Sequence, residues 1–464
     1  MDGLSPFDCL SPLDYRYYAG KPEVFARLSP FLSERARVAY EAKVEAAVAQ
    51  AFAARGLCTA EQAAEITRAC EAVTAEEVAD EETRVKHNTR ALVNCIRRRV
   101  SDQAGRFVHL GLTSFDVVDT ATSLRLRDFT HEVLRPDFLT LERHLIALAL
   151  REKATPQIGR THGQFAIPIT FGFAIASYVS RLGGRMERIR DTAKNLRGKI
   201  SGAVGAYNAL SLLLPDPLAF EADVLQRLSL EPSSHSTQIV EAEYLTDYLH
   251  SVVSALGVLA NLCDDMRHLQ RSEISEVGEV FEAAQVGSSS MPHKRNPESF
   301  EHVKSMWKAF APRMLTFYMD QISEHQRDLT NSASQRFVTE VVAALDLCVT
   351  RLSHVMSRLV VDRQAMARNL ANATTIVAEP LYILLAAAGH PDAHEAMRRL
   401  TQEAAESGRS VMDLISSRPD LAQYLGALQP RQAEALRSPQ DYVGLAVRKT
   451  EAVCREWQAR LDLD

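Results

Sequence analysis

Two long stretches of this chain contain almost no residue that would end a helix. Neither glycine nor proline occurs from position 313 to position 379, and Gly257 is the only residue of either kind between positions 233 and 277. Both stretches are rich in Ala, Leu, Arg and Glu, which favour helix, whereas glycine and proline interrupt it. We therefore predict long helices across both stretches.

The apolar residues of the second stretch follow the spacing of a helix bundle. Leu256, Leu259, Cys263 and Met266 are separated by three, four and three positions, which is typical of a bundle seam. No segment of useful length alternates apolar and polar residues, so we expect little sheet. The fold class predicted is all-α, with long helices packed against each other and against other subunits.

The uneven distribution of glycine and proline predicts three domains. A length of 464 residues allows two or three. We expect an N-terminal helical domain over residues 1–107, a central long-helix bundle over residues 108–361 and a C-terminal helical domain over residues 362–464. The C-terminal region is again punctuated by glycine and proline.

Composition excludes several classes of function. A net charge of −6 argues against broad neutralisation of nucleic-acid phosphates. No run of about 18 apolar residues predicts a membrane span, and the N-terminal residues do not resemble a signal peptide. The seven cysteines are scattered and form no C-x-x-C pair, so we expect neither a disulfide framework nor a zinc site. We expect a cytoplasmic location.

Four polar islands interrupt the helical pattern, and the first two contain histidine. In "VHLGLTSFD", Thr113 or Ser114 is suited to cap the following helix, while the alternative is that both hydroxyls and His109 bind a ligand. In "GRTHGQ", His162 lies beside Arg160 in a predicted loop. A histidine next to a fixed cation suits proton donation, although a lone loop histidine is more often structural.

The third island, "GSSSMPHKRNP", combines a small-residue flap with cations. Asn296 suits an N-cap and Pro297 the first helical position, which places Lys294 and Asn296 at the positive end of a helix. Such an end is an anion site. The alternative is a flexible connection followed by a capped helix.

The fourth island, "EHQRDLTNSASQR", carries Arg327, Ser332 and Arg336. A solvated helical face is one interpretation, and recognition of phosphate or carboxylate by the arginines is the other. The four islands together hold anion-binding and proton-transfer groups, and the chain lacks H-E-x-x-H, a P-loop and a dinucleotide-binding glycine motif. This combination predicts acid–base chemistry on an anionic substrate, without a metal or other cofactor.

Several motifs, in order, resemble one family. "GSSSMPHKRNP" resembles the signature of the fumarase/aspartase superfamily, and "VHLGLTSFDVVDT", "IGRTHGQFAIPITFG" and "RDLTNSASQR" are similar to the adenylosuccinate lyase family within it. The resemblance covers roughly residues 10–340. It implies a three-domain homotetramer with a central bundle and shared active sites. It also implies cleavage of adenylosuccinate to AMP and fumarate, and of the succinylocarboxamide ribotide of purine synthesis to its carboxamide product.

The resemblance implies roles for individual positions. Ser288 would be the general base and His162 the general acid, while Lys294 and Asn296 hold the succinyl part of the substrate. The catalytic group that it implies is Ser288, His162, Lys294, His87 and Glu301. The substrate-binding positions, with Arg16 and Tyr17 as a nucleotide-binding pair, are Arg16, Tyr17, Lys86, His87, Asn88, His109, Thr113, Ser114, Gln238, Asn296, Arg327, Ser332 and Arg336.

This chain departs from the family pattern at two places. The family usually has His-Asp where this sequence has His87-Asn88, and many members have Arg-Asp where "TQIVEAEY" supplies Glu241 and Glu243. Both departures concern nucleotide contacts.

Two rival functions are considered. The superfamily's 3-carboxymuconate lactonizing enzyme shares the "MPHKRNP" type, but it binds no nucleotide, so Arg16-Tyr17 and "RDLTNSASQR" favour the lyase. A non-catalytic, crystallin-like structural protein is the rival from another class. Loss of the flap serine or the loop histidine would favour it, and both residues are present.

Overall fold

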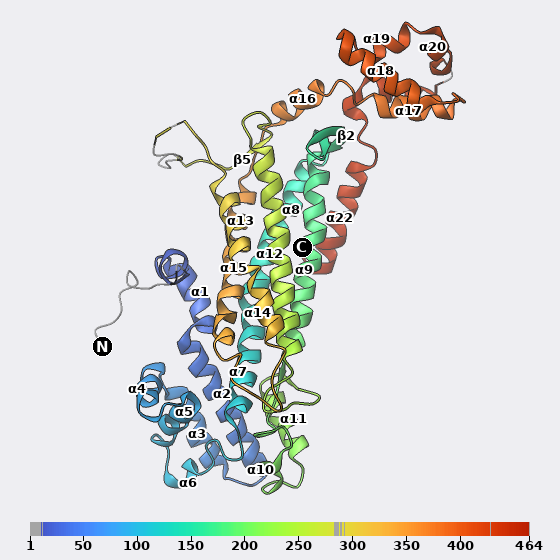
Figure 1. Cartoon of the computed structure of the whole chain (residues 1–464). Helices are drawn as coiled ribbons and strands as arrows, with labels where there is room; N and C mark the ends of the chain where they lie inside the picture. The colour runs from blue at the N-terminus through green and yellow to red at the C-terminus, as the bar shows by residue number, and fades with distance from the viewer. Residues whose placement is uncertain are drawn as a thin grey trace. The chain divides into compact units, whose positions relative to one another are not determined.

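The structure is a computed structural model, drawn in Figure 1. It describes residues 11, 13–282, 287, 290–291, 293–426 and 428–463. Helices account for most of this part of the chain, which confirms the all-α prediction. Among the described residues, no helix is both long enough and apolar enough to cross a membrane.

The α-helices in chain order are α1 (Pro22–Leu32), α2 (Glu34–Ala54), α3 (Ala60–Ala72), α4 (Ala75–Val85), α5 (Asn88–Arg97), α6 (Asp102–Gly105), α7 (Ser114–Phe129), α8 (Arg135–Arg151), α9 (Phe171–Lys194), α10 (Asn208–Ser211), α11 (Pro217–Arg227), α12 (Ala242–Leu269), α13 (Glu298–Phe310), α14 (Arg313–Met319), α15 (Val338–Ser357), α16 (Arg363–Asn372), α17 (Ala378–Ala387), α18 (Ala393–Ser407), α19 (Val411–Ser416), α20 (Pro419–Leu425), α21 (Pro430–Arg437) and α22 (Ala446–Leu461). Shorter π-helical and 3₁₀ segments are Leu13–Ala19, Thr130–Leu134, Ser334–Phe337 and Pro439–Asp441.

The strands are few and short, as predicted. They form three two-stranded sheets in the described part of the chain. The strands are β1 (Pro156–Thr161) with β2 (Gln164–Thr170), β3 (Arg197–Gly198) with β4 (Glu231–Pro232), and β5 (Val277–Gly278) with β6 (Val360–Val361).

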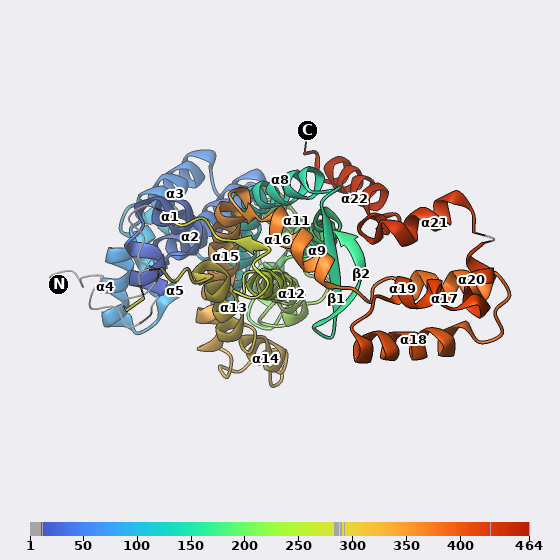
Figure 2. The same cartoon turned by 90° about the horizontal axis from the view of Figure 1, so that it is seen from above.

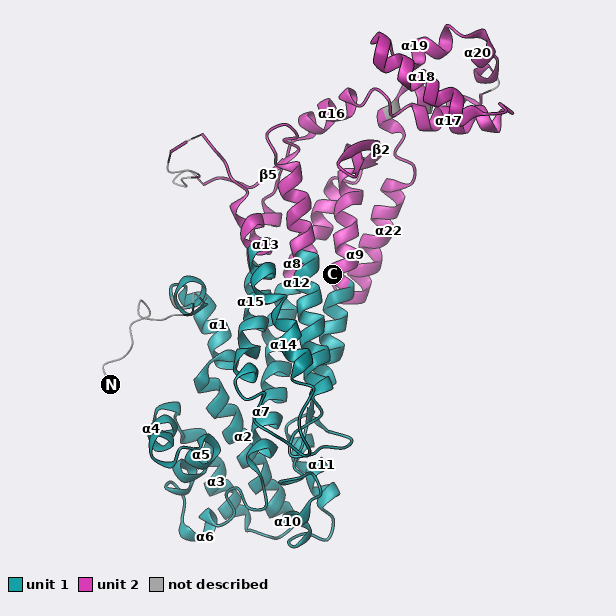
Figure 3. Cartoon of the chain, in the orientation of Figure 1, with its two compact units in different colours: residues 1–138, 184–259, 305–350 teal, residues 139–183, 260–304, 351–464 magenta. Residues whose placement is uncertain are grey.

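The chain divides into two compact units, coloured in Figure 3. Unit 1 comprises residues 1–138, 184–259 and 305–350, and unit 2 comprises residues 139–183, 260–304 and 351–464. Five of the long helices contribute residues to both units, namely α8, α9, α12, α13 and α15. The division into three domains stays a prediction.

The N-terminal core of unit 1 is organised by α2. This helix is rich in alanine and is buried on almost every side, and α3 and α7 pack against it. Its start is fixed by Ser33, whose hydroxyl accepts the N–H of Ala36. Phe52 near its end stacks on Phe220 with ring centroids 4.8 Å apart. Small side chains on α2 allow the neighbouring helices to approach closely, as Figure 2 shows for α3.

The seam predicted on α12 is confirmed. Leu256, Leu259, Cys263 and Met266 are all at most 2% exposed. Helix α9 lies beside α12, because Thr192 bonds to Ser251 at 3.0 Å in unit 1 and Tyr178 donates to Asp265 in unit 2. The long-helix interpretation of residues 233–277 therefore holds for Ala242–Leu269, and the residues on either side of this range are not helical.

The prediction of unbroken helix over residues 313–379 is wrong. Helix α14 ends at Met319, and residues 320–333 are irregular before α15 begins. The Asp328 carboxylate accepts the N–H groups of Glu324 at 3.0 Å and Thr330 at 2.8 Å, which gives this segment an alternative to helical bonding. His325 also has a positive φ of 48°. The fourth island is thus a structured loop and not a helical face.

The C-terminal part of unit 2 contains a small helical core of its own. Helices α17, α18, α19 and α20 contact one another, as Figures 1 and 2 both show. Their shared core includes Leu381, Leu385, Leu400 and Ile415, each completely buried. These short amphipathic helices satisfy their apolar faces among themselves.

A close approach of two helices makes Gly183 sensitive to substitution. A Cβ at Gly183 on α9 would overlap the indole of the buried Trp457 on α22. We predict that Gly183→Ala lowers the free energy of unfolding by about 1–3 kcal/mol, because the side chain overpacks the contact. Thermal denaturation at one fixed protein concentration measures the change.

Gly257→Ala is the matched control, since Gly257 also lies inside a long helix. Its Cβ would meet only Nε1 of Trp307, at 3.4 Å. The higher helix propensity of alanine predicts an unchanged or slightly raised Tm. Equal losses of stability in both variants would contradict the close-contact explanation.

Candidate active site

The first island forms the start of α7, as the capping interpretation predicted. Thr113 is the N-cap residue, and its N–H donates to the Asp116 carboxylate at 2.8 Å. This reciprocal bonding fixes the chain direction at the helix start. Ser114 is the first helical residue, so both predicted hydroxyls sit at a rigid helix end.

A buried ion pair holds this helix end against a second segment. The Asp116 carboxylate and the Lys199 ammonium are both fully buried, and Lys199 donates to Asp116. Asp116 also accepts the N–H groups of Ser201 at 3.0 Å and Gly202 at 3.2 Å. The charges are therefore paired and further hydrogen-bonded, the condition under which buried ions are tolerated.

His109 is held by the carboxylate of Glu45, a residue that no sequence motif selects. Its Nδ1 lies 2.6 Å from Glu45 Oε1, and its N–H donates to Glu45 Oε2 at 3.1 Å. Burial lowers the pKa of His109, but the Glu45 charge and hydrogen bond outweigh it and raise the pKa above its ordinary value. His109 also has a positive φ of 62°, so its orientation is set by both backbone and side chain.

The segments carrying Gln238 and Arg327 are joined to each other. The N–H of Gln238 donates to the carbonyl of Gln326 at 3.2 Å. Arg327 Nε donates to the carbonyl of Asp328 at 2.9 Å, and its Cζ lies 3.2 Å from the ring centroid of Phe115. Unit 1 thus brings together two residues predicted from separate motifs.

Asp119 is a further residue of this region that the motifs did not select. It accepts the N–H of Val240 at 2.9 Å and so fixes the segment after Gln238. Burial raises its pKa to about 6, opposed by that hydrogen bond and by the charges of Lys199 and Arg327. Its place within "VHLGLTSFDVVDT" was a signal that could have identified it.

The two departures from the family pattern have structural roles. Glu241 accepts the hydroxyls of Ser233 and Ser234 and the N–H of His235, and Glu243 accepts the amide of Gln321 at 3.3 Å. Asn88 Oδ1 accepts the N–H of Thr89 at 2.7 Å.

The remaining predicted residues of unit 1 lie on segment ends and loops. His87 caps α5 by accepting the N–H of Arg90 at 3.2 Å, and Lys86 before it has a left-handed φ of 56°. Arg16 is exposed and Tyr17 is partly buried in the π-helical segment near the N-terminus. Ser332 and Arg336 are exposed on and after the irregular loop.

The loop predicted around His162 is the tip of a β-hairpin. Thr161 pairs with Gln164, so His162 and Gly163 form the two-residue turn. Their φ angles are 54° and 75°, which suit a hairpin turn with two left-handed residues. The His162 side chain is exposed in the single chain.

Arg160 anchors this hairpin inside unit 2. Its guanidinium donates to the fully buried Glu276 carboxylate at 2.6 Å. Gln157 and Asn369 donate to the same carboxylate at 2.7 and 2.8 Å. Arg160 is therefore committed to a structural ion pair, while the neighbouring histidine stays exposed.

The third island differs from its predicted cap. Helix α13 begins at Glu298, and Asn296 donates its side-chain N–H to the carbonyl of Gly287 at 2.7 Å. The N–H groups of Ser299 and Phe300 donate to the Glu279 carboxylate at 3.0 Å. An anion does bind this helix end, but it is the chain's own carboxylate.

The other predicted residues of this island are accessible or undescribed. Lys294 and Glu301 are exposed, and Glu301 lies 3.8 Å from Arg267. Ser288, the predicted base, lies outside the described residues.

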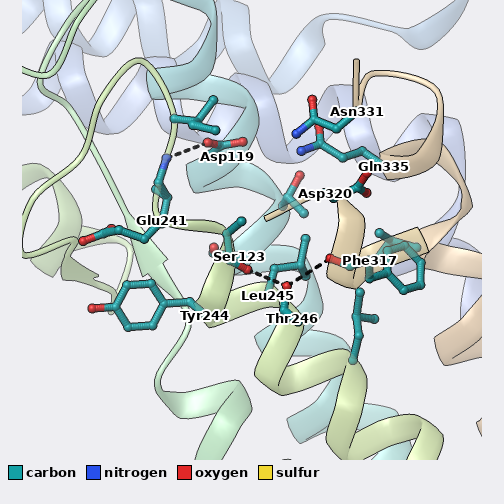
Figure 4. A pocket seen from close by; sticks show the side chains of 16 residues that line it. Asp119, Ser123, Glu241, Tyr244, Leu245, Thr246, Phe317, Asp320, Asn331 and Gln335 are labelled. Atoms are coloured by element: carbon teal, nitrogen blue, oxygen red, sulfur yellow. Dashed lines mark hydrogen bonds between the residues drawn. The ribbon is translucent and has the colours of Figure 1, made fainter. Parts of the chain in front are cut away.

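A small cavity of unit 1 lies beside the Gln238 and Arg327 segments. It has a volume of about 60 Å³, and Figure 4 shows its lining side chains, including Asp119, Asp320, Asn331 and Gln335. None of the predicted substrate residues lines it. Because ligand pockets for molecules of drug size measure roughly 300–1,000 Å³, the cavity is too small for a nucleotide.

Comparison with known proteins defines the class first. Residues 16–309 match the family model described as "Lyase", and residues 323–432 match "Adenylosuccinate lyase C-terminal". The structure of 3-carboxy-cis,cis-muconate lactonizing enzyme from Pseudomonas putida superposes with a TM-score of 0.81 at 25% identity, covering 94% of this chain and 97% of that one. The fold and the first match are those of the lyases of the fumarase/aspartase superfamily.

Two relatives narrow the assignment from the superfamily to one family within it. The chain is 32% identical to adenylosuccinate lyase of Archaeoglobus fulgidus, covering 96% of this chain and 98% of the relative. It is 34% identical to adenylosuccinate lyase of Methanothermobacter thermautotrophicus, covering 97% and 99%. The chain belongs to the adenylosuccinate lyase family.

The His109–Glu45 pair predicts a pH-dependent contribution to stability. The folded-state pKa of His109 is raised, so the pair stabilises fully below the unfolded value of about 6.5 and loses its effect as pH rises through the folded pKa. We predict that Glu45→Gln lowers the free energy of unfolding by about 1.5–3 kcal/mol near pH 6, and by less near pH 9. Denaturant unfolding across this range measures the difference.

Ser353→Ala supplies the control for this comparison. His144 bonds to the Ser353 hydroxyl at 3.0 Å, so its partner carries no charge. The cost of this substitution should not diminish at high pH. A pH-independent cost of Glu45→Gln would show that His109 and Glu45 do not form a charged pair.

Proposed function

We propose that this chain cleaves adenylosuccinate to AMP and fumarate, and the succinylocarboxamide ribotide to its carboxamide product and fumarate, in purine nucleotide synthesis. The observation that carries the proposal is the near full-length similarity to adenylosuccinate lyases, including the C-terminal family match. The reaction requires no metal or other cofactor.

The chemistry is a β-elimination with two proton transfers. Ser288 removes a proton from the carbon beside a carboxylate, the carbon–nitrogen bond breaks, and His162 protonates the leaving nitrogen. A serine is a poor base unless nearby positive charge stabilises its alkoxide, and the exposed Lys294 supplies such charge. The exposed position of His162 on a rigid hairpin supports its role, because a proton donor has to reach a bound substrate.

The other predicted residues are proposed to bind the two ends of the substrate. Lys294 and Asn296 bind the succinyl part, with His87 and Glu301 completing the catalytic group. Arg16 and Tyr17 bind the nucleotide part. The further substrate-binding residues are Lys86, Asn88, His109, Thr113, Ser114, Gln238, Arg327, Ser332 and Arg336. The joined segments of Gln238 and Arg327 support this grouping.

The active form is proposed to be a cytoplasmic homotetramer. In that assembly, residues from different copies of the chain complete each active site. The exposure of His162, Lys294 and Arg336 in the single chain supports this arrangement, since each side chain remains accessible to a neighbouring copy.

Two substitutions test the proposed acid and base. Ser288→Ala and His162→Asn should each lower kcat for adenylosuccinate by about 100- to 10,000-fold, because each removes one proton-transfer group. Asparagine tolerates the left-handed backbone of position 162, so the turn is preserved. The ultraviolet absorbance change on conversion of adenylosuccinate measures turnover, and substrate binding should be retained.

His131→Ala is the control, because His131 is an exposed histidine outside the proposed site. It should leave turnover within about twofold of the wild-type rate. Near-normal turnover of Ser288→Ala or His162→Asn would remove that residue from its role. A folded wild-type protein that leaves adenylosuccinate unchanged but converts 3-carboxymuconate would replace the proposed function with that of the rival enzyme.

A further inference from the structure

Helix α7 presents two side chains, one turn apart, to the loop segments that carry Gln238 and Arg327. Phe115 lies under the guanidinium of Arg327, and Asp119 bonds to Val240 two residues after Gln238. Residues four apart lie on one face of a helix. The same face of α7 therefore contacts both loop segments.

The Arg327 guanidinium is held in place by its neighbours, but one of its hydrogen-bond donors has no partner among the described residues. Its Nε is used by the carbonyl of Asp328, and one of its faces is covered by the ring of Phe115. Its Nη1 is buried and has no hydrogen-bond partner among the described residues. Asp119 and Asp328 act on Arg327 through their charges and not through a side-chain hydrogen bond to its guanidinium.

A buried donor without a partner is unfavourable, and an anion would relieve it. Burial lowers the pKa of Arg327, opposed by the charges of Asp119 and Asp328. These two carboxylates stabilise the positive charge of Arg327 without a side-chain hydrogen bond to it. The unsatisfied Nη1 therefore lacks an acceptor, which an anionic ligand would supply.

We propose that Phe115 and Asp119 are positioning residues that orient Arg327 so that its free Nη1 binds an anionic group of the substrate, a phosphate or a carboxylate. The inference rests on the proposed function and deepens it. The ring of Phe115 orients Arg327 by covering one face of its guanidinium. Asp119 orients it by the attraction of its charge and by its hydrogen bond to Val240, in the segment after Gln238.

The first test replaces the aromatic face. Phe115→Leu should raise the KM for adenylosuccinate by about 3- to 30-fold with kcat within about twofold, because it weakens binding that is equal in ground and transition states. Phe115→Tyr keeps the ring and should restore the KM. Asp119→Asn keeps the shape of the side chain and should raise the KM in the same direction.

A double substitution tests whether Phe115 acts through Arg327. In an Arg327→Gln background, Phe115→Leu should cause no further rise in KM, since the group that it positions is gone. A further rise of the full size, an unchanged KM in Phe115→Leu, or equal losses in the leucine and tyrosine variants would each overturn the proposal.

Product inhibition distinguishes the two kinds of anion. If Arg327 binds the phosphate, Phe115→Leu should weaken inhibition by AMP and leave inhibition by fumarate unchanged. If it binds a carboxylate, the reverse should hold. No change in inhibition by either product would contradict the proposal.

Tyr244→Leu is the matched control. Its ring also lies beneath an arginine, with Arg197 Cζ 5.6 Å from the ring centroid, and neither residue belongs to the proposed site. It should leave the KM unchanged. If wild-type protein does not convert adenylosuccinate, the proposed function fails; calorimetric titration with inorganic phosphate then tests the positioning of Arg327 separately, and equal affinity in wild type and Phe115→Leu would overturn it.

Discussion

The buried ion pair between Asp116 and Lys199 is the interaction on which the arrangement of unit 1 depends. Isolated charges are strongly disfavoured in a protein interior, so each partner holds the other in place, and the Asp116 carboxylate gathers N–H groups from two separate segments. Loss of one partner would cost on the order of 3–5 kcal/mol, because the other charge would remain buried. The pair thereby fixes the start of α7, and with it Thr113, Ser114 and Phe115.

Helix α7, fixed at its start, contacts polar groups of segments that lie far from it in the sequence. Its first turns contact the segments that follow Gln238 and precede Asp328, and the loop before it presents His109 to Glu45. Unit 2 uses the same device around a different carboxylate, since Glu276 gathers three donors at the base of the His162 hairpin. In both units a buried carboxylate holds neighbouring segments together, through backbone N–H groups at Asp116 and through side-chain donors at Glu276.

Local patterns predicted what depends on local physics. The three-and-four spacing from Leu256 to Met266 identified the buried seam of α12, and the hydroxyl residues Thr113 and Ser114 identified a capped helix start. The motifs identified candidate site residues, because each motif is contiguous. Glu45 and Glu279 could not be selected, since their partners lie 64 and 20 residues away. The break at residues 320–333 was missed because side-chain bonds of Asp328, and not glycine or proline, support the non-helical backbone there.

The carboxylate of Glu279 at the start of α13 has an electrostatic consequence for the loop before it. The positive end of the helix is already neutralised by an internal anion, so it adds little field to attract a second one. In the proposed reaction, attraction of the anionic substrate to this loop then depends on exposed side-chain cations such as Lys294. Screening by salt limits the attraction of these exposed charges to about 8 Å at physiological ionic strength. Anion binding by this loop therefore depends strongly on salt concentration. Binding at a helix end shielded from solvent would depend on it less.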